Sequence, residues 1–161
     1  MPRFGRSQVV RRRRRGSGFE LVLSGEMRQV LRNLLGELEE LLVAEPNDPS
    51  LRRLHPPAYL DDDESDAAYQ LLAGDELRTS RHEAIQAVVS SLDADELTED
   101  DLWNWMQALN AVRLVAGTRL DVSEDDVEPG PTGPDDPNAP MWAIYGLMTF
   151  LQHEVVEALS G

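Results

Sequence analysis

The most regular pattern in the sequence predicts a helix over residues 26–44. Its apolar residues recur at spacings of three and four, which places them on one face of a helix with 3.6 residues per turn. They are Met27, Val30, Leu31, Leu34, Leu35, Leu38, Leu41 and Leu42. Pro46 and Pro49 follow, and proline lacks an amide donor and disfavours helical geometry in the residue before it. The helix is therefore expected to end close to Ala44.

A strand-like periodicity precedes this helix. Residues 8–24 form two strand-length segments on either side of Gly16-Ser17-Gly18, a turn sequence that suits a β-hairpin. In the second segment Phe19, Leu21 and Leu23 alternate with polar residues, as in a strand with one buried face. The first segment carries five consecutive arginines, whose aliphatic stems can lie across a sheet while the charged groups stay in water. The sequence therefore predicts a hairpin with one basic strand.

Two helices separated by a glycine are expected in the middle of the chain. Residues 51–60 are irregular and proline-rich, and the acidic residues that follow open a short helix from Asp61 to Ala73. Gly74 is expected to interrupt the helical pattern. A longer helix then runs from Asp75 to Leu92, with one apolar face.

A further helix begins after Thr98. This residue precedes three acidic residues, an arrangement close to a capping box, so a helix is expected from Glu99 to Ala116. Its apolar arc is wide, which indicates a central and largely buried helix. Gly117 follows in the position where glycine ends a helix in the left-handed conformation.

The last part of the sequence combines an acidic segment with an apolar helix. Residues 121–138 are too polar and proline-rich to bury much surface, and we expect a mobile acidic loop. A helix over residues 138–160 follows, and its first half is apolar nearly all round, which predicts burial in the core or in a homodimer interface. Together these patterns predict a mainly α fold, a single helical domain of about five helices with an N-terminal β-hairpin at 8–24. The helical core is expected to span residues 25–118.

Charge divides the sequence into a basic start and an acidic remainder. Seven of the first fifteen residues are arginine, whereas the remainder contains 8 arginines and 30 Asp and Glu residues; the whole chain has a net charge of −15. Arginine binds phosphate well, so the hairpin arginines are candidate nucleic-acid contacts: Arg11, Arg12, Arg13, Arg14 and Arg15. The acidic remainder repels a duplex and aromatic residues are scarce near these arginines, so we expect only weak or assisted DNA contact. The alternative is a solvated edge strand protected by its charge.

The sequence contains no motif of a known catalytic or metal site. It has no cysteine, which excludes thiolate metal sites and thiol redox chemistry within it. The three histidines form no HExxH pair, the acidic clusters lack the glycine of a calcium-binding loop, and no nucleophile or phosphate-loop motif is present. We therefore expect no metal, no cofactor and no enzymatic activity. The alternative is an enzyme or small-ligand-binding module with an unrecognised pocket among the helices.

The sequence also bears on location. The longest apolar stretch, residues 141–151, is about half the length of a membrane span, and the basic start leads to no long apolar run. We expect a cytoplasmic protein with no membrane contact.

Arg113 is the most unusual polar residue of the predicted helices. It lies on the same stripe as Leu102, Met106 and Leu109, so its guanidinium points toward apolar surroundings and needs a partner. Its own helix offers none at the neighbouring turns, so we expect a distant carboxylate or the carbonyls that end another helix. An ion pair that locks the helix is favoured over a binding site.

The segment around Arg113 resembles a known family. Residues 109–126, LNAVRLVAGTRLDVSEDD, fit the pattern L-N-x-x-R-L-x-x-G-T-R-L-x-V-x-E-D of the actinobacterial oxidative stress regulator (AosR-like) family, formerly a family of unknown function. Residues 51–59, LRRLHPPAY, are similar to that family's L-x-R-L-x-P-x-A-Y. The basic hairpin, the leucine-rich helix and the apolar last helix fall in the same order, so the resemblance spans nearly the whole sequence.

This resemblance implies a non-enzymatic regulator of redox stress genes that acts with a sigma factor of RNA polymerase. A protein partner is thus expected, with a homodimer through the last helix as a further possibility. The resemblance also implies structural or partner-binding roles for Asn110, Arg113, Gly117, Thr118 and Arg119. A redox regulator would normally sense oxidants through cysteine thiolates, so direct disulfide sensing is excluded for a sequence without cysteine.

Overall fold

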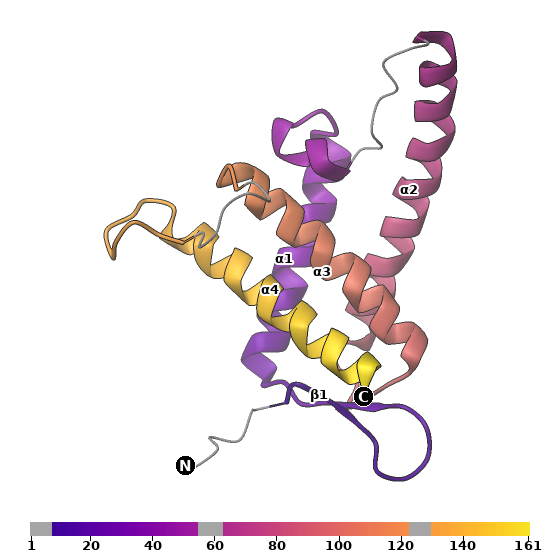
Figure 1. The fold of residues 1–161 in the computed structure, drawn as a ribbon, viewed down its shortest axis with the longest axis vertical. Coiled ribbons are helices and arrows are strands. Elements are labelled where there is room, and N and C mark those ends of the chain that lie inside the picture. The colour runs from indigo at the N-terminus through magenta and orange to yellow at the C-terminus, as the bar shows by residue number, and fades with distance from the viewer. Residues whose placement is uncertain (1–7, 55–62, 123–129) are drawn as a thin grey trace.

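The computed structural model describes residues 8–54, 63–122 and 130–161. Within these residues it confirms a mainly α fold with an N-terminal β-hairpin (Figure 1). In chain order, the elements are β1 (Val10–Arg12), β2 (Phe19–Leu21), α1 (Gly25–Ala44), the 3-10 helix η1 (Pro49–Leu54), α2 (Asp63–Ser91), β3 (Glu96–Leu97), α3 (Glu99–Arg119) and α4 (Ala139–Ser160).

Helix α3 lies at the centre of the helical bundle. Helices α1, α2, η1 and α4 all pack against it. In Figure 1, α3 and α4 run side by side and both cross in front of α1, while α2 stands to one side and its N-terminal half extends past the other helices. The three strands form an antiparallel sheet in the order β1-β2-β3, at the end of the bundle where α4 ends. The central position of α3 explains the wide apolar arc that the sequence predicted for this helix.

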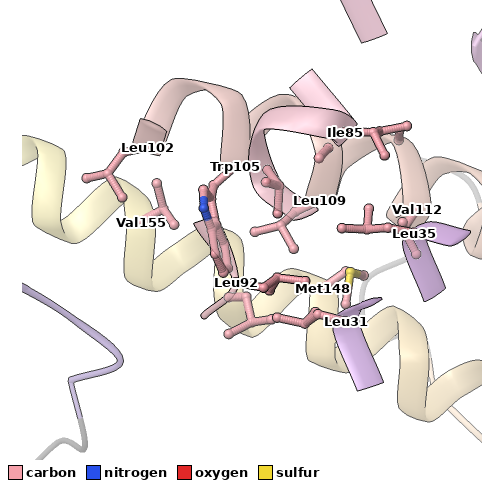
Figure 2. Close-up of a cluster of buried hydrophobic side chains, with 14 of the residues drawn as sticks. Leu31, Leu35, Ile85, Leu92, Leu102, Trp105, Leu109, Val112, Met148 and Val155 are labelled. Carbon is pink, nitrogen blue, oxygen red and sulfur yellow. The ribbon is translucent and has the colours of Figure 1, made fainter. Parts of the chain in front are cut away.

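The core joins all four long helices. Figure 2 shows Trp105 of α3 among side chains from α1, α2 and α4. Its ring is 1% exposed, and its indole N–H donates to the Ser91 hydroxyl at 3.0 Å. This bond satisfies the polar group of a side chain whose ring is otherwise buried among apolar neighbours. The labelled neighbours are Leu31, Leu35, Ile85, Leu92, Leu102, Leu109, Val112, Met148 and Val155.

Two predicted helix starts are capped. The Ser24 hydroxyl accepts from the Met27 amide at 3.1 Å at the start of α1. At α3 the Thr98 hydroxyl accepts from the Asp101 amide at 3.1 Å, and the Asp101 carboxylate accepts from the Thr98 amide at 2.8 Å. The capping box predicted at Thr98 is therefore confirmed, and it satisfies amides that have no partner within the helix.

Two of the predicted helix boundaries are wrong. Gly74 does not interrupt the chain, because α2 continues from Asp63 to Ser91. A single glycine destabilises a helix interior by only about 1 kcal/mol, which the packing of the later turns of α2 on α3 outweighs. Gly117 does not end α3 either, since the helix continues to Arg119 and the left-handed residue is Asp121, with φ 57°.

Strand β3 is absent from the sequence-based prediction. It has only two residues, too few for a periodic pattern, and it pairs with β2 in the register Phe19 opposite Leu97. The amide of Leu21 donates to the Asp95 carbonyl at 2.8 Å just before it. The connection between α2 and α3 thereby becomes the third strand of the sheet.

Helix α4 is less buried than the sequence predicted. Its fully buried residues form one face, consisting of Met148, Leu151, Val155 and Ala158. Phe150 and Val156 are 45% and 44% exposed, so burial on several sides is wrong for the isolated chain. The homodimer alternative stays a prediction. Of the predicted acidic loop, residues 123–129 lie outside the described residues, and 130–138 form turns around Asp136, which accepts from the Thr132 and Asn138 amides.

Candidate interaction surfaces

Two glycines shape the turn that presents the hairpin arginines. Gly16 and Gly18 have φ values of 79° and 102°, in a region that residues with a side chain rarely adopt. A Cβ on Gly18 would also lie 3.2 Å from the carbonyl oxygen of Leu97. The turn therefore favours glycine at both positions, and it aligns β1 with β2 so that Arg11 lies opposite Glu20.

Two of the hairpin arginines attach the strand to its neighbours. The Arg12 guanidinium donates to the Ala158 carbonyl at 3.2 Å and lies 5.1 Å from the centre of the Phe19 ring. Ala158 is in the last turn of α4, where unpaired carbonyls and the helix dipole favour a cation. Arg13 lies 3.5 Å from the Glu96 carboxylate on β3. These two residues therefore have a structural use that requires no ligand.

The other three hairpin arginines face the solvent. Arg11, Arg14 and Arg15 are exposed, and none of them has an ion pair or a side-chain hydrogen bond among the described residues. They line an open cavity of about 760 Å³ beside the end of α4, which also includes the carboxylates of Glu20 and Glu157. Guanidinium groups in such a place can bind phosphate or carboxylate bidentately. The predicted nucleic-acid contact stays a prediction, and among the five arginines these three are the ones without a side-chain partner in the described residues.

The predicted partner of Arg113 is wrong. The structure places this half-buried side chain against α4, where its Nε donates to the Thr149 hydroxyl at 3.1 Å and its terminal nitrogen donates to the Tyr145 hydroxyl at 3.1 Å. Its guanidinium also lies 5.1 Å from the centre of the Tyr145 ring. The Thr149 hydroxyl donates to the Tyr145 carbonyl at 2.9 Å, which leaves its lone pairs to accept from Arg113. Half-burial keeps part of the guanidinium near water, so no carboxylate is needed to neutralise it.

The other residues of the same segment divide between contact with α4 and exposure. The Asn110 side-chain oxygen accepts from Gln152 of α4 at 3.4 Å. The buried Thr118 hydroxyl donates to the Leu114 carbonyl at 2.7 Å within α3. Arg119 is exposed at the end of α3. Asn110 and Arg113 therefore contact α4, whereas Arg119 is exposed, and the partner-binding roles of these residues stay predictions.

Gly117 allows close packing between the two segments that resemble the AosR-like family, residues 51–59 and 109–126. A Cβ at this position would lie 3.2 Å from the Tyr145 ring and 3.4 Å from the Arg53 guanidinium. Arg53 belongs to the first resembling segment, residues 51–59, and it donates to the Val122 carbonyl at 2.5 Å. The Val122 amide in turn donates to the Gly117 carbonyl at 2.9 Å. The described parts of both segments thus form one structural unit at the end of α3.

Comparison with known proteins agrees with the resemblance seen in the sequence. Residues 8–159 match the family described as a domain of unknown function, DUF2017. The chain belongs to the DUF2017 family. Relatives from Mycobacterium bovis and Mycobacterium tuberculosis, each named oxidative stress regulator AosR, are 31% identical to it over 153 residues, covering 78% of this chain and 67% of the relative. No solved structure matches it.

One side chain central to this DUF2017 chain was not among the predicted site residues. Arg28 of α1 donates to the carbonyls of Leu21 and Leu23 at 3.3 and 3.1 Å, and to those of Leu92 and Ala94 at 2.9 and 2.8 Å. It also lies 3.2 Å from the Asp95 carboxylate, and its side chain is 12% exposed. Its spacing from Leu31 and Leu35 puts it on the buried face of α1, a signal that could have revealed it.

The DUF2017 chain also has a small cavity between α1 and α2. Its volume is about 280 Å³, at the lower end of the roughly 300–1,000 Å³ of small-molecule sites. The His82 ring and the Gln86 amide lie 3.0 and 3.1 Å from the two Glu39 carboxylate oxygens, and the buried Arg81 donates to the Leu54 carbonyl at 3.3 Å. Burial and the nearby Arg78 lower the pKa of Arg81. Each of these polar groups has a partner within the protein, and the ligand-module alternative stays a prediction.

The described part of the DUF2017 chain has neither a cluster typical of a metal site nor a helix typical of a membrane span. Among the described residues, no group of three or more His, Asp or Glu side chains is placed to hold a metal ion. Within the same part of the chain, no helix combines the length and the apolar content of a membrane span.

Proposed function

We propose that this DUF2017 protein is a non-enzymatic cytoplasmic regulator of the response to oxidative stress, and that it acts by binding a sigma factor of RNA polymerase. The observation that carries the proposal is the 31% identity to proteins named oxidative stress regulator AosR over most of the chain. The match covers 78% of this chain, so the fold of those relatives is expected to be the same.

The distribution of charge supports a protein partner and a secondary role for DNA. Exposed carboxylates occur on α1, α2 and the start of α3, and the chain has a net charge of −15. Such a surface attracts basic proteins and speeds their association. Arg11, Arg14 and Arg15 carry the opposite, positive charge and are exposed beside the end of α4. In the proposed complex the acidic surface binds the polymerase component, and these arginines contact DNA held nearby.

Sensing of oxidants is assigned to the partner. This sequence has no cysteine, so a disulfide cannot form within it. A regulator without a thiol still couples to oxidation when its affinity depends on the redox state of the protein that it binds.

The experiment that tests the proposal is direct binding to purified RNA polymerase. The tagged protein is mixed with core enzyme and with holoenzymes that each carry one sigma factor, under reducing and oxidising conditions. We expect retention that requires a sigma factor. Absence of binding to core enzyme and to every holoenzyme, in both conditions, would overturn the proposal.

The role of the outward arginines is tested separately. Replacing Arg11, Arg14 and Arg15 by glutamine is expected to weaken salt-dependent retention on DNA while leaving the melting temperature nearly unchanged. Replacing Arg12 and Arg13 by glutamine is the matched control, expected to lower the melting temperature because it removes the contacts with Ala158 and Glu96. Equal DNA retention by the triple variant and the unmodified protein would show that these three arginines do not contribute to DNA binding.

A further inference from the structure

A groove with an apolar floor lies between α1 and α4. Its volume is about 410 Å³, and α3 contributes its base through Val112, Val115 and Ala116. Leu34 and Leu41 of α1 form one wall, and Met141 and Ile144 of α4 form the other; these four side chains are only half-buried. Apolar side chains that remain accessible in a concave surface favour the binding of another apolar group.

The rim of this groove is acidic. Glu37, Glu40 and Glu45 of α1 line it and are exposed, and none of the three takes part in an ion pair among the described residues. Arg119 is exposed at the rim on α3. The residues that line the groove therefore include three exposed carboxylates and one guanidinium. The rim as a whole attracts cations.

We propose that this groove binds an amphipathic helix of a protein partner that is apolar on one face and carries Arg or Lys beside that face. The α1 residues that line it recur at positions 34, 37, 38, 41, 44 and 45, over three turns or about 16 Å. A groove of this length fits a helix with anchors at i, i+3 or i+4, and i+7. The acidic rim selects cations at the flanks of those anchors. The inference rests on the proposed function in that it supplies the surface for the polymerase component.

A second copy of this chain fits the groove poorly. The exposed apolar residues that a second copy could offer include Phe150 and Val156 on α4, and Leu71, Leu72 and Leu77 on α2, where the acidic Asp75 and Glu76 lie beside the leucines. Helix α4 has no arginine or lysine, and its neighbouring Glu154 and Glu157 would face the carboxylates of the rim. Like charges placed across an interface disfavour binding. The occupant is therefore a basic helix from another protein.

The test uses a designed probe with the whole chain. The probe is a fluorescent 18-residue peptide of leucine and lysine, with leucine at helical spacings on one face, and its control has the same composition in scrambled order. Binding is followed by fluorescence anisotropy, and the site is mapped from methyl NMR signals of Leu34, Leu41 and Ile144. We expect the patterned peptide to bind and to shift these signals, whereas the scrambled peptide binds at least tenfold more weakly.

Three variants connect the binding to the groove. Glu37→Lys with Glu40→Lys is expected to weaken binding on the order of tenfold, because two attractions become repulsions. Glu76→Lys with Glu83→Lys makes the same change in net charge at exposed positions of α2 and is expected to change binding less than about twofold. Ala44 is exposed at the end of the groove, so Ala44→Tyr blocks it without disturbing the core and is expected to weaken binding as well.

Several results would overturn the inference. They are equal binding of patterned and scrambled peptides, equal loss in the two charge-reversal variants, or no shift of the groove signals. Concentration-dependent shifts of these signals without peptide would instead assign the groove to a second copy. Sigma-dependent binding to polymerase that survives Glu37→Lys with Glu40→Lys and Ala44→Tyr would leave the proposed function standing and refute the groove. Peptide binding at the groove without polymerase binding would support the groove and refute the proposed function.

Discussion

Removing the Arg28 guanidinium is expected to destabilise the protein more than the loss of an ion pair would. In Arg28→Ala the carbonyls of Leu21, Leu23, Leu92 and Ala94 lose a charged donor together. These carbonyls belong to the hairpin and to the connection between α2 and β3, so the change affects the join between sheet and helices.

The expected loss of stability comes mainly from the hydrogen bonds between Arg28 and the four carbonyls, and only slightly from its ion pair with the Asp95 carboxylate. The Asp95 side chain is 88% exposed, so its pairing with Arg28 contributes at most about 0.5 kcal/mol after screening. A hydrogen bond from a charged donor contributes about 1.5–3 kcal/mol, and bonds made by a single group are not additive. Water replaces some of them because the site is only partly buried. We therefore expect a loss of about 3 kcal/mol, or roughly 6–12 °C in melting temperature for a chain of this size.

The assay is thermal and urea unfolding of three variants, combined with hydrogen exchange. Arg32→Ala is the matched control, since Arg32 makes an exposed pair with Asp93 at 3.0 Å and is expected to cost less than about 1 kcal/mol. Arg28→Lys keeps the charge without the planar fork and is expected to recover less than half of the loss. The Leu21 and Val22 amides should exchange faster in Arg28→Ala. The reasoning is refuted if Arg28→Lys is as stable as the unmodified protein, or if Arg28→Ala matches Arg32→Ala.

Three further predictions concern the segment at the end of α3 and its neighbours. Arg113→Ala, which removes two hydrogen bonds and a ring contact on α4, is expected to lower stability by about 1–2 kcal/mol; unchanged melting with loss of a partner would make Arg113 a binding residue instead. Gly117→Val is expected to cost about 2 kcal/mol by overpacking against Tyr145, whereas Gly36→Val, where a Cβ has open space, should change stability by less than about 0.5 kcal/mol; equal effects would contradict the close approach. Hydrogen bonds from the Ser50 hydroxyl and amide hold the pKa of Asp48 below its ordinary value of 3.8, so the stability that this carboxylate contributes is present above that value and is lost as the pH falls through the lower folded pKa. The decrease in melting temperature below about pH 4 should therefore be smaller in Asp48→Asn, and identical acid unfolding curves for the two proteins would count against it.

The fold was predictable wherever burial imposes a period. Helix α1 begins one residue before the predicted range, and the hairpin pairs across the predicted turn. Thr98 identified the start of α3 because a capping box is a purely local arrangement. Gly74 and Gly117 misled because the effect of a glycine depends on what it packs against, which distant residues decide.

The candidate sites were less predictable, because each depends on groups far apart in sequence. The five consecutive arginines were visible in the sequence. Which of them contact the rest of the protein depends on Ala158, which binds Arg12, and on Glu96, which pairs with Arg13. Arg113 was singled out on α3, but the sequence did not indicate its hydroxyl partners, which come from α4. The groove over α3 combines three helices, and its apolar lining residues look like ordinary core positions in the sequence. Spacing along one helix contains no information about such an assembly.

The attachment of the hairpin to α4 has a consequence for synthesis. The Val9 amide donates to the Glu154 carboxylate at 3.2 Å, and this contact spans 145 residues of sequence. The Arg12 contact with Ala158 spans 146. During translation the arginine strand leaves the ribosome first, but it gains these contacts only after α4 has followed. A chain that ends before α4 therefore lacks both contacts, and its arginine strand is not anchored to the helical bundle.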